Sequence, residues 1–160
     1  MPIYWIDAGV LIMASNGHYG FKLVPKFWTW IHGQIECGTV RMPKLAYQEV
    51  VDGNDELARW CKDRKGLGYF CVRPEKEVQL RYKTIADYVY IKYKAHQAGE
   101  FLRGADGWLI AHALETQGFV VTEENVRHNL SKIKIPTVAK ALHAPWKNTV
   151  DMCKELGAKF

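Results

Sequence analysis

Five acidic residues stand where packing alone would favour an apolar side chain. Each follows or interrupts an apolar segment: Asp7 after IYWI, Glu49 within AYQEVV, Asp106 at the start of ADGWLIAHA, and Glu123 and Glu124 after FVVT. An ionised carboxylate buried without a partner is strongly unfavourable, and gathered carboxylates raise one another's pKa values unless a cation intervenes. Hard divalent cations such as Mg²⁺ and Mn²⁺ prefer all-oxygen ligands. If these acids converge, the sequence therefore predicts a metal site.

Each acid also has a purely structural interpretation. Asp106 suits a helix N-terminus through the helix dipole. Glu49 could pair with a lysine, and Asp7 could cap the turn before GVLI. Each of these interpretations can explain one acid by itself. The occurrence of acids next to apolar residues at three separate strand or helix ends is better explained by a shared site.

The elements that must position these acids alternate along the chain. Apolar runs bounded by Gly and Pro predict strands at residues 3–6, 38–43, 119–122 and 132–136, and a strand or extended connection at 68–72. Helical spacing predicts helices at residues 9–14, 25–36, 44–51, 56–63, 75–97, 104–118 and 149–157. Alternating strands and helices indicate an α/β domain whose central sheet is mainly parallel and flanked by helices. In such folds sites form beyond the carboxyl ends of the strands, where Asp7 and Glu123/Glu124 are expected to meet.

Composition bounds the class of protein. The 160 residues are expected to form one domain, residues 1–160, with 48% hydrophobic and 24% charged residues. The net charge of +5 modestly favours a polyanionic partner. The sequence predicts no signal peptide and no membrane span, and a cytoplasmic location is expected. Because the four cysteines show no metal-ligand spacing, they are expected to be small core residues in a reducing compartment.

Other catalytic motifs are absent from the sequence. The six histidines form no H-x-H or H-E-x-x-H pattern, and His112 is expected to be a hydrogen-bonded, half-buried residue. There is no P-loop, G-x-S-x-G or G-x-G-x-x-G motif. The acids are thus the residues that suggest chemistry.

In order and context, the segments YWIDAGVLI, AYQEVV, ADGWLIAHA and FVVTEEN resemble the PIN-domain ribonucleases, a superfamily that includes the VapC-type toxins. VPKFWTWI, IKIP and ELGAKF also resemble a PIN-like subfamily, so the resemblance covers essentially the whole chain. It implies a single PIN-like nuclease domain. By the same resemblance Asp7, Glu49 and Asp106 fall on metal-binding acids and Glu124 on the fourth, with Glu123 the less favoured choice.

The chain departs from the family pattern at two positions. Most relatives carry Asn, Ser or Thr two residues after the first acid, where this chain has Gly9. Glu124 replaces the more usual Asp, so its longer side chain could bind metal through water. Both departures bear on the strength of catalysis more than on the fold.

The resemblance implies a Mg²⁺- or Mn²⁺-dependent endoribonuclease in which Asp7, Glu49, Asp106 and Glu124 are catalytic and metal-binding. It further implies the toxin of a type II toxin–antitoxin pair, an RNA substrate, a small antitoxin partner and a homodimer. An acidic pocket that receives RNA needs a basic rim, for which the sequence offers Lys22, Lys44, Arg103, Arg127, Lys132 and Lys134.

Three alternatives stay open at the level of sequence. The chain could be a nuclease for structured DNA or RNA that is not a toxin. It could also be a non-catalytic PIN-like module that binds RNA or protein with an impaired acid site, which Gly9 favours. The third alternative is a purely structural domain.

Overall fold

The structure, a computed structural model, describes residues 2–125 and 131–160. Its sheet has the strand order β2-β1-β3-β4, and each strand is parallel to its neighbours. The strands are short: β1 (Tyr4–Ile6), β2 (Val40–Arg41), β3 (Phe119–Val121) and β4 (Trp146–Lys147). The expected α/β class with a parallel central sheet is confirmed, and it is the class of a PIN-like domain.

The side chains of the two central strands, β1 and β3, point alternately to the two faces of the sheet, and both faces are apolar. Tyr4, Ile6 and Val121 contribute to one hydrophobic cluster, whereas Trp5 and Val120 contribute to the other. Successive side chains of a strand point to opposite faces, so a three-residue strand buried throughout feeds both cores. Both faces of the sheet must therefore be covered by helices.

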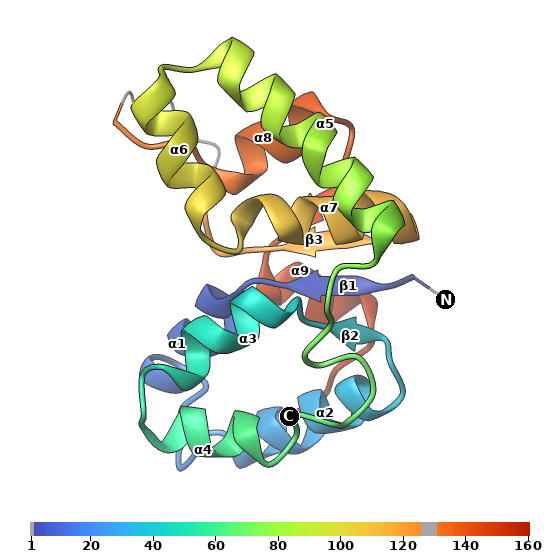
Figure 1. The fold of residues 1–160 in the computed structure, drawn as a ribbon. Coiled ribbons are helices and arrows are strands. Elements are labelled where there is room, and N and C mark those ends of the chain that lie inside the picture. Colours follow the sequence, from blue (N-terminus) through green and yellow to red (C-terminus); the bar gives the residue numbers. More distant parts are fainter. Residues whose placement is uncertain (1, 126–130) are drawn as a thin grey trace.

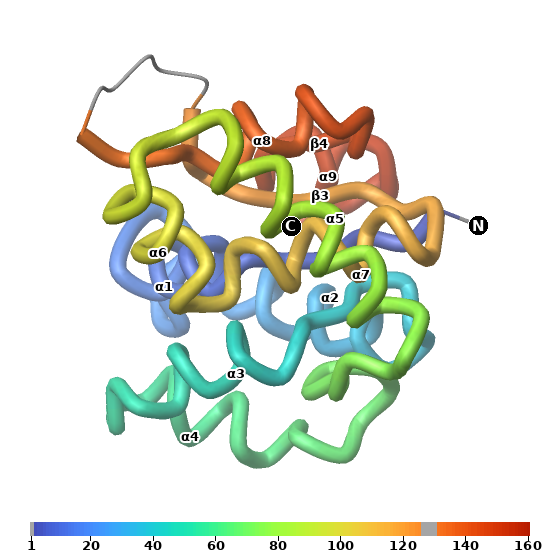
Figure 2. The backbone as a smooth tube through the Cα atoms, turned by 45° about the horizontal axis from the view of Figure 1, so that its top comes forward, coloured from blue at the N-terminus to red at the C-terminus, as the bar shows by residue number. Residues whose placement is uncertain are grey.

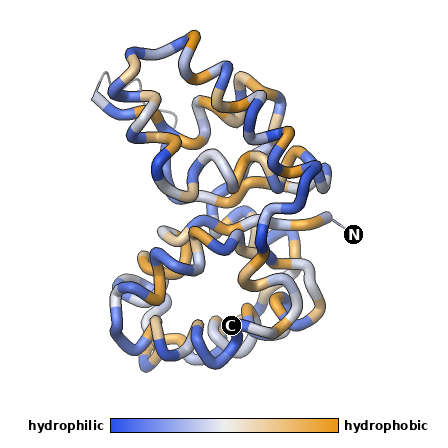
Figure 3. The backbone as a smooth tube through the Cα atoms, viewed as in Figure 1, coloured by the Kyte–Doolittle hydropathy of each residue, from blue (hydrophilic) through white to orange (hydrophobic). Residues whose placement is uncertain are grey.

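One set of helices covers each face, as two views of the backbone agree (Figures 1 and 2). The first core is built with α1 (Ala8–Asn16), α2 (Pro25–Glu36), α3 (Lys44–Val51), α4 (Glu56–Lys62) and α9 (Thr149–Glu155). The second is built with α5 (Lys76–Lys92), α6 (Ala95–Arg103), α7 (Asp106–Thr116) and α8 (Ile135–Ala141). Figure 3 shows hydrophobic and hydrophilic residues interspersed along the helices, as expected for helices that each bury one side.

Local signals place most of these elements correctly. Pro25 begins α2, whose Phe27, Trp28 and Ile31 are buried at the expected helical spacing. Asp55 caps α4 by accepting a hydrogen bond from Ala58 N at 2.9 Å. Residues 68–71 are turns and bends rather than a strand or an extended connection, and Val72 alone forms a bridge, with Pro43, while Val72 N donates to Met42 O.

The helix expected at residues 75–97 is in fact two helices. The backbone at Tyr93 and Lys94 is extended, so α5 ends at Lys92 and α6 begins at Ala95. No Gly or Pro marks this break. The reason is tertiary: α6 turns back so that Ala98 and Phe101 are buried in the second core.

The strand expected at residues 132–136 is wrong, since Ile135 begins α8. Pro136 lacks an amide hydrogen, which a first helical turn tolerates and a central strand does not. The outer strand is β4 instead, which pairs with β3 through Thr122 N to Lys147 O at 3.0 Å. Two residues are too short to show an alternating pattern.

Two smaller expectations also need correction. Gln117, rather than Gly118, adopts the left-handed conformation that ends α7, while a Cβ at Gly118 would lie 2.7 Å from Ile3 O. Of the cysteines, Cys61 and Cys153 are buried as expected, but Cys37 is exposed. In the part of the chain that the structure describes, no helix has the length and apolar character to cross a bilayer.

Candidate active site

Asp7 lies at the carboxyl end of β1, in the centre of the sheet. Its backbone N donates to Val121 O at 3.0 Å, which aligns the ends of β1 and β3. The residue occupies the N-cap position of α1, yet its side chain makes no capping hydrogen bond. Its carboxylate, in a residue only 9% exposed, instead accepts a hydrogen bond from Thr122 Oγ1 at 3.4 Å. The capping interpretation of Asp7 therefore fails.

Thr122 links this acid to the next one. Its hydroxyl accepts a hydrogen bond from Glu124 N at 3.1 Å while it donates to Asp7. Thr122 is fully buried, so the turn after β3 is fixed at the point where Glu124 leaves the sheet. In the sequence Thr122 appears only as the residue before the two glutamates in FVVTEEN, and its positioning role is seen in the structure.

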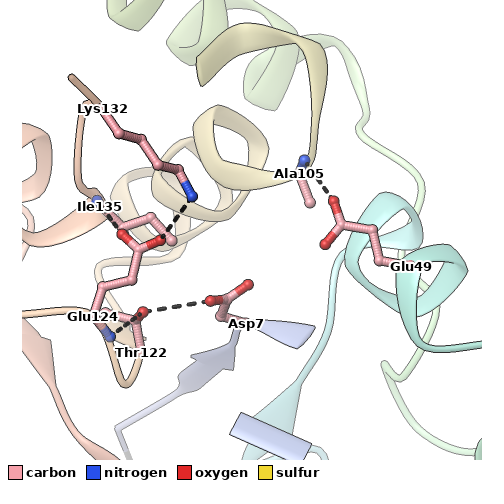
Figure 4. A network of polar contacts seen from close by, with 7 residues as sticks. All are labelled: Asp7, Glu49, Ala105, Thr122, Glu124, Lys132 and Ile135. Atoms are coloured by element: carbon pink, nitrogen blue, oxygen red, sulfur yellow. Dashed lines mark hydrogen bonds and ion pairs between the residues drawn. The ribbon is translucent and has the colours of Figure 1, made fainter. Parts of the chain in front are cut away.

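Glu124 reaches across to the segment that leads into α8. Its Oε2 accepts a hydrogen bond from Ile135 N at 2.8 Å, and its Oε1 lies 4.0 Å from Lys132 Nζ (Figure 4). Glu123 turns elsewhere and accepts hydrogen bonds from the backbone and hydroxyl of Thr149 at the start of α9. Of the two adjacent glutamates, Glu124 lies with the other acids and Glu123 does not.

Glu49 approaches from the opposite side, on α3 (Figure 4). Its Oε1 accepts a hydrogen bond from Ala105 N at 3.2 Å, immediately before α7. A Cβ at Gly104 would lie 3.2 Å from the same oxygen, so a small residue gives Glu49 its room. The expectation that Glu49 shares an apolar side of α3 is wrong: Glu49 and Leu45 are exposed, and the buried side is formed by Ala46 and Val50.

Asp106 is the first residue of α7 and half-buried. The corner before it is held by Tyr82, whose hydroxyl donates to Leu102 O at 2.9 Å and whose ring stacks on Trp108 at 3.8 Å. A Cβ at Gly107 would lie 2.9 Å from the Tyr82 ring, so glycine permits this close packing. Across the described ranges, the Asp106 carboxylate has no hydrogen bond or ion pair of its own.

One cavity of about 300 Å³ collects the four acids. Its described lining consists of Asp7, Gly9, Glu49, Gln97, Glu100, Phe101, Gly104, Asp106, Glu124, Lys132 and Ile133. Glu100, on the exposed side of α6, was not singled out from the sequence, because the helix that carries it was not expected there. A Cβ at position 9 would lie 3.4 Å from Asp7 Oδ2, so glycine leaves this side of the carboxylate uncovered.

Burial and mutual repulsion make the acids hard to ionise together. Burial, followed by the charges of Glu124 and Glu49, raises the pKa of Asp7 to about 6. Burial and the charges of Asp7, Glu124 and Glu49 raise the pKa of Asp106 to about 8. Burial also raises the pKa of Glu49, although the hydrogen bond from Ala105 N opposes the change. A site of this kind favours a cation or retains a proton.

The donor set fits a hard divalent cation in its chemistry, because all four acids offer carboxylate oxygens. In residues 2–125 and 131–160, however, no three Asp, Glu, His or Cys side chains stand close enough together to form a ready-made site. Glu49 and Glu124 are held apart from the other acids because one carboxylate oxygen of each accepts a hydrogen bond from a backbone amide of another segment. Asp7 and Asp106 are the acids left without such a tether, and the catalytic and metal-binding roles of all four residues stay predictions.

The expected basic rim is only partly assembled. Lys132 lines the cavity, whereas Lys44 lines a different pocket beside Trp108 and His112. Arg103 ends α6 and is exposed, and Lys134 is the N-cap residue of α8. Lys22 is exposed in the loop before α2. Arg127 lies outside the described residues.

His112 differs from its expectation. It is 2% exposed rather than half-buried, and its Nε2 has no hydrogen-bond partner among the described residues. Its ring stacks on Trp5 with 4.4 Å between centroids. Burial lowers the pKa of His112 to about 4, so the ring is neutral at pH 7. It belongs to the core rather than to the acid cavity.

Solved structures with the same fold share little sequence with this chain. The structure of VapBC2 from Rickettsia felis bound to a DNA fragment from their promoter matches with a TM-score of 0.56 and 11% identity, over 91% of this chain and 98% of that chain. FitAcB from Neisseria gonorrhoeae matches with a TM-score of 0.55 and 16% identity, over 91% and 97%. No curated protein matches. The family described as "Domain of unknown function (DUF4411)" matches residues 4–160, and the chain belongs to this family.

Proposed function

We propose that this protein is a Mg²⁺- or Mn²⁺-dependent endoribonuclease that hydrolyses RNA phosphodiester bonds, and that it is the toxin of a type II toxin–antitoxin pair. The observation that carries the proposal is the cavity that collects four acids, drawn from β1, α3, α7 and the end of β3, where burial and the neighbouring acids raise the pKa values of Asp7 and Asp106. The sequence resemblance to VapC-type toxins and the fold shared with VapBC2 and FitAcB support the toxin assignment. On the same basis we propose a small antitoxin and a second copy of the chain as partners.

The proposed roles follow from how each acid is held. Asp7 and Asp106 would be the principal metal ligands, because among the described residues neither carboxylate is tethered to a backbone amide of a distant segment, as Glu49 and Glu124 are. Glu49 and Glu124 would complete the ligand shell or orient a water through their untethered oxygens. A bound divalent ion would supply a Lewis acid and a water of lowered pKa. Thr122 would hold the Asp7 carboxylate in place through its hydrogen bond.

The direct test is cleavage of a labelled RNA by the purified protein in Mn²⁺, in Mg²⁺ and in EDTA. We expect Asp7→Asn and Asp106→Asn each to lose at least about 100-fold in rate, since each removes a charge from the metal site. Asp87→Asn makes the same chemical change at an exposed position on α5 and should keep wild-type activity. Equal activity in all four proteins would identify a contaminating nuclease and refute the proposal.

A second candidate function is a non-catalytic PIN-like module that binds RNA or protein. Gly9 favours it, since no polar side chain at position 9 supports Asp7. Metal binding without RNA turnover would select this alternative. A purely structural domain would bind metal no more tightly than Asp106→Asn does.

A further inference from the structure

Lys132 places a positive charge inside the acid cavity. Among the described residues that line this cavity, it is the one cationic side chain. Its Nζ lies 4.0 Å from Glu124 Oε1, and Figure 4 shows the amine directed toward the centre of the site. The side chain is 59% exposed, so it enters the cavity from the rim and can leave without unpacking the core.

More than one acid senses this charge. Lys132 lines the same cavity as Glu49, Asp106 and Glu124. Its charge therefore faces acids contributed by α3, by α7 and by the end of β3.

Glu124 has one oxygen left to offer a cation. Its Oε2 is occupied by Ile135 N at 2.8 Å, whereas Oε1 faces the Lys132 amine. Oε1 accepts no backbone hydrogen bond among the described residues, so it is the Glu124 oxygen better placed to bind a divalent ion, and it is the oxygen that Lys132 faces. Two positive charges at one carboxylate repel each other, so the amine and the ion compete.

We propose that the Lys132 ammonium group is the built-in counter-ion of the metal-free cavity and is exchanged for the divalent ion when that ion binds. Lys132 then sets the metal concentration at which the site fills. The inference rests on the metal-binding part of the proposed function and adds a regulatory element to it. Its consequence is that removing the lysine strengthens metal binding, the opposite of what removing a ligand does.

The test is calorimetric titration of Mn²⁺ into the purified protein without RNA, so that no catalytic activity is needed. We expect Lys132→Met to bind Mn²⁺ roughly fivefold more tightly than wild type at low salt, and high salt should shrink the difference by screening the charge. Lys132→Arg keeps the charge and should bind as wild type does. Lys140→Met removes a charge from the exposed end of α8 and is the matched control, with unchanged affinity expected.

A second measurement separates the proposal from a structural role. Without metal at pH 8, Lys132→Met should melt about 2 °C below wild type because its acids have lost their counter-ion, whereas saturating Mn²⁺ should remove or reverse this difference. Unchanged or weaker Mn²⁺ binding by a folded Lys132→Met variant would overturn the proposal while leaving a metal-dependent nuclease possible. If neither protein binds Mn²⁺, both the proposal and the metal-dependent function fail.

Discussion

Asp7 and Asp106 are held in a setting that opposes their ionisation. Their pKa values, raised to about 6 and about 8, arise from burial and from the neighbouring acids. A carboxyl group whose pKa is raised by folding keeps its proton in the folded state while the unfolded chain loses it. The stability that Asp7 and Asp106 contribute to the metal-free protein should therefore fall as pH rises from about 4 to about 8.

The variant Asp106→Asn isolates this effect. In EDTA at pH 8 it should be at least about 2 kcal/mol more stable than wild type, because its neutral side chain escapes the repulsion, and at pH 4 the two proteins should be nearly equal. Urea denaturation at both pH values measures the difference. Asp87→Asn, on the exposed side of α5, should show no such pH dependence. A wild type that gains stability between pH 4 and 8 relative to Asp106→Asn would contradict the assigned repulsion.

His112 gives a pH dependence of the opposite sign. Its pKa is lowered to about 4 by burial, so between pH 4 and 6.5 the unfolded chain binds a proton that the folded protein excludes. Acid should thus destabilise wild type through this residue by about 2 kcal/mol over that interval. His112→Phe keeps an aromatic ring against Trp5 and should be less sensitive to acid, as followed by denaturation at pH 4.5 and 7.

Exposed His96, changed to Phe, serves as the control and should leave the acid sensitivity unchanged. Equal acid sensitivity of wild type and His112→Phe would show that the buried ring is protonated or solvated in the folded protein.

At the scale of elements, the two adjacent glutamates after β3 have different partners and are expected to have different roles. Glu124 lines the cavity, whereas Glu123 accepts hydrogen bonds from Thr149, the first residue of α9. Glu124→Gln should weaken Mn²⁺ binding roughly 10-fold, as loss of a charged group beside a metal does. Glu123→Gln should leave Mn²⁺ binding unchanged and lower the free energy of unfolding by about 0.5 to 1 kcal/mol, since a negative charge leaves a helix N-terminus. Titration calorimetry measures Mn²⁺ binding and urea denaturation measures stability for both variants. Weaker Mn²⁺ binding by Glu123→Gln with unchanged binding by Glu124→Gln would refute the assignment.

The ends of β1 and β3 could be predicted from the sequence because they depend on short-range signals. The buried run before Asp7 and the T-x-acid turn before Glu124 fix where each acid leaves the sheet, and parallel strands bring those ends together. The break at Tyr93 and the short strand β4 depend on packing between distant segments, which local patterns do not record. Glu100 escaped notice for the same reason, since α6 meets the cavity through tertiary packing alone.

The exposure of Glu49 shows a second limit. A pattern of apolar neighbours in AYQEVV places Glu49 near the core, but an eight-residue helix turns only about twice and small shifts in orientation change its exposed side. The hydrogen bond from Ala105 N, more than fifty residues away in the chain, fixes where Glu49 points. Such long-range tethers decide the exact shape of the site.

At the scale of the whole molecule, the sheet separates two cores and gathers the acids at one edge. Asp7 stands at the start of α1 and Glu49 on α3, which help to build the first core, whereas Asp106 begins α7 and Ile135, which binds Glu124, begins α8 in the second. Figure 1 shows α1 and α3 on one side of the sheet and α7 and α8 on the other. The chain carries a net charge of +5, whereas the described lining of the cavity carries five acidic residues and one lysine, so the molecule as a whole attracts a polyanion more readily than the metal-free cavity does. This contrast ties metal loading to RNA binding in the proposed function.

Anomalous diffraction from a crystal of the wild-type protein equilibrated with Mn²⁺ tests the central claim most directly, because it locates the ion independently of any activity. We expect a manganese peak in the acid cavity, about 2.1 Å from carboxylate oxygens of Asp7 and Asp106 and with Lys132 turned away from Glu124. A cavity without manganese density at saturating Mn²⁺, with Lys132 still facing Glu124, would contradict the account.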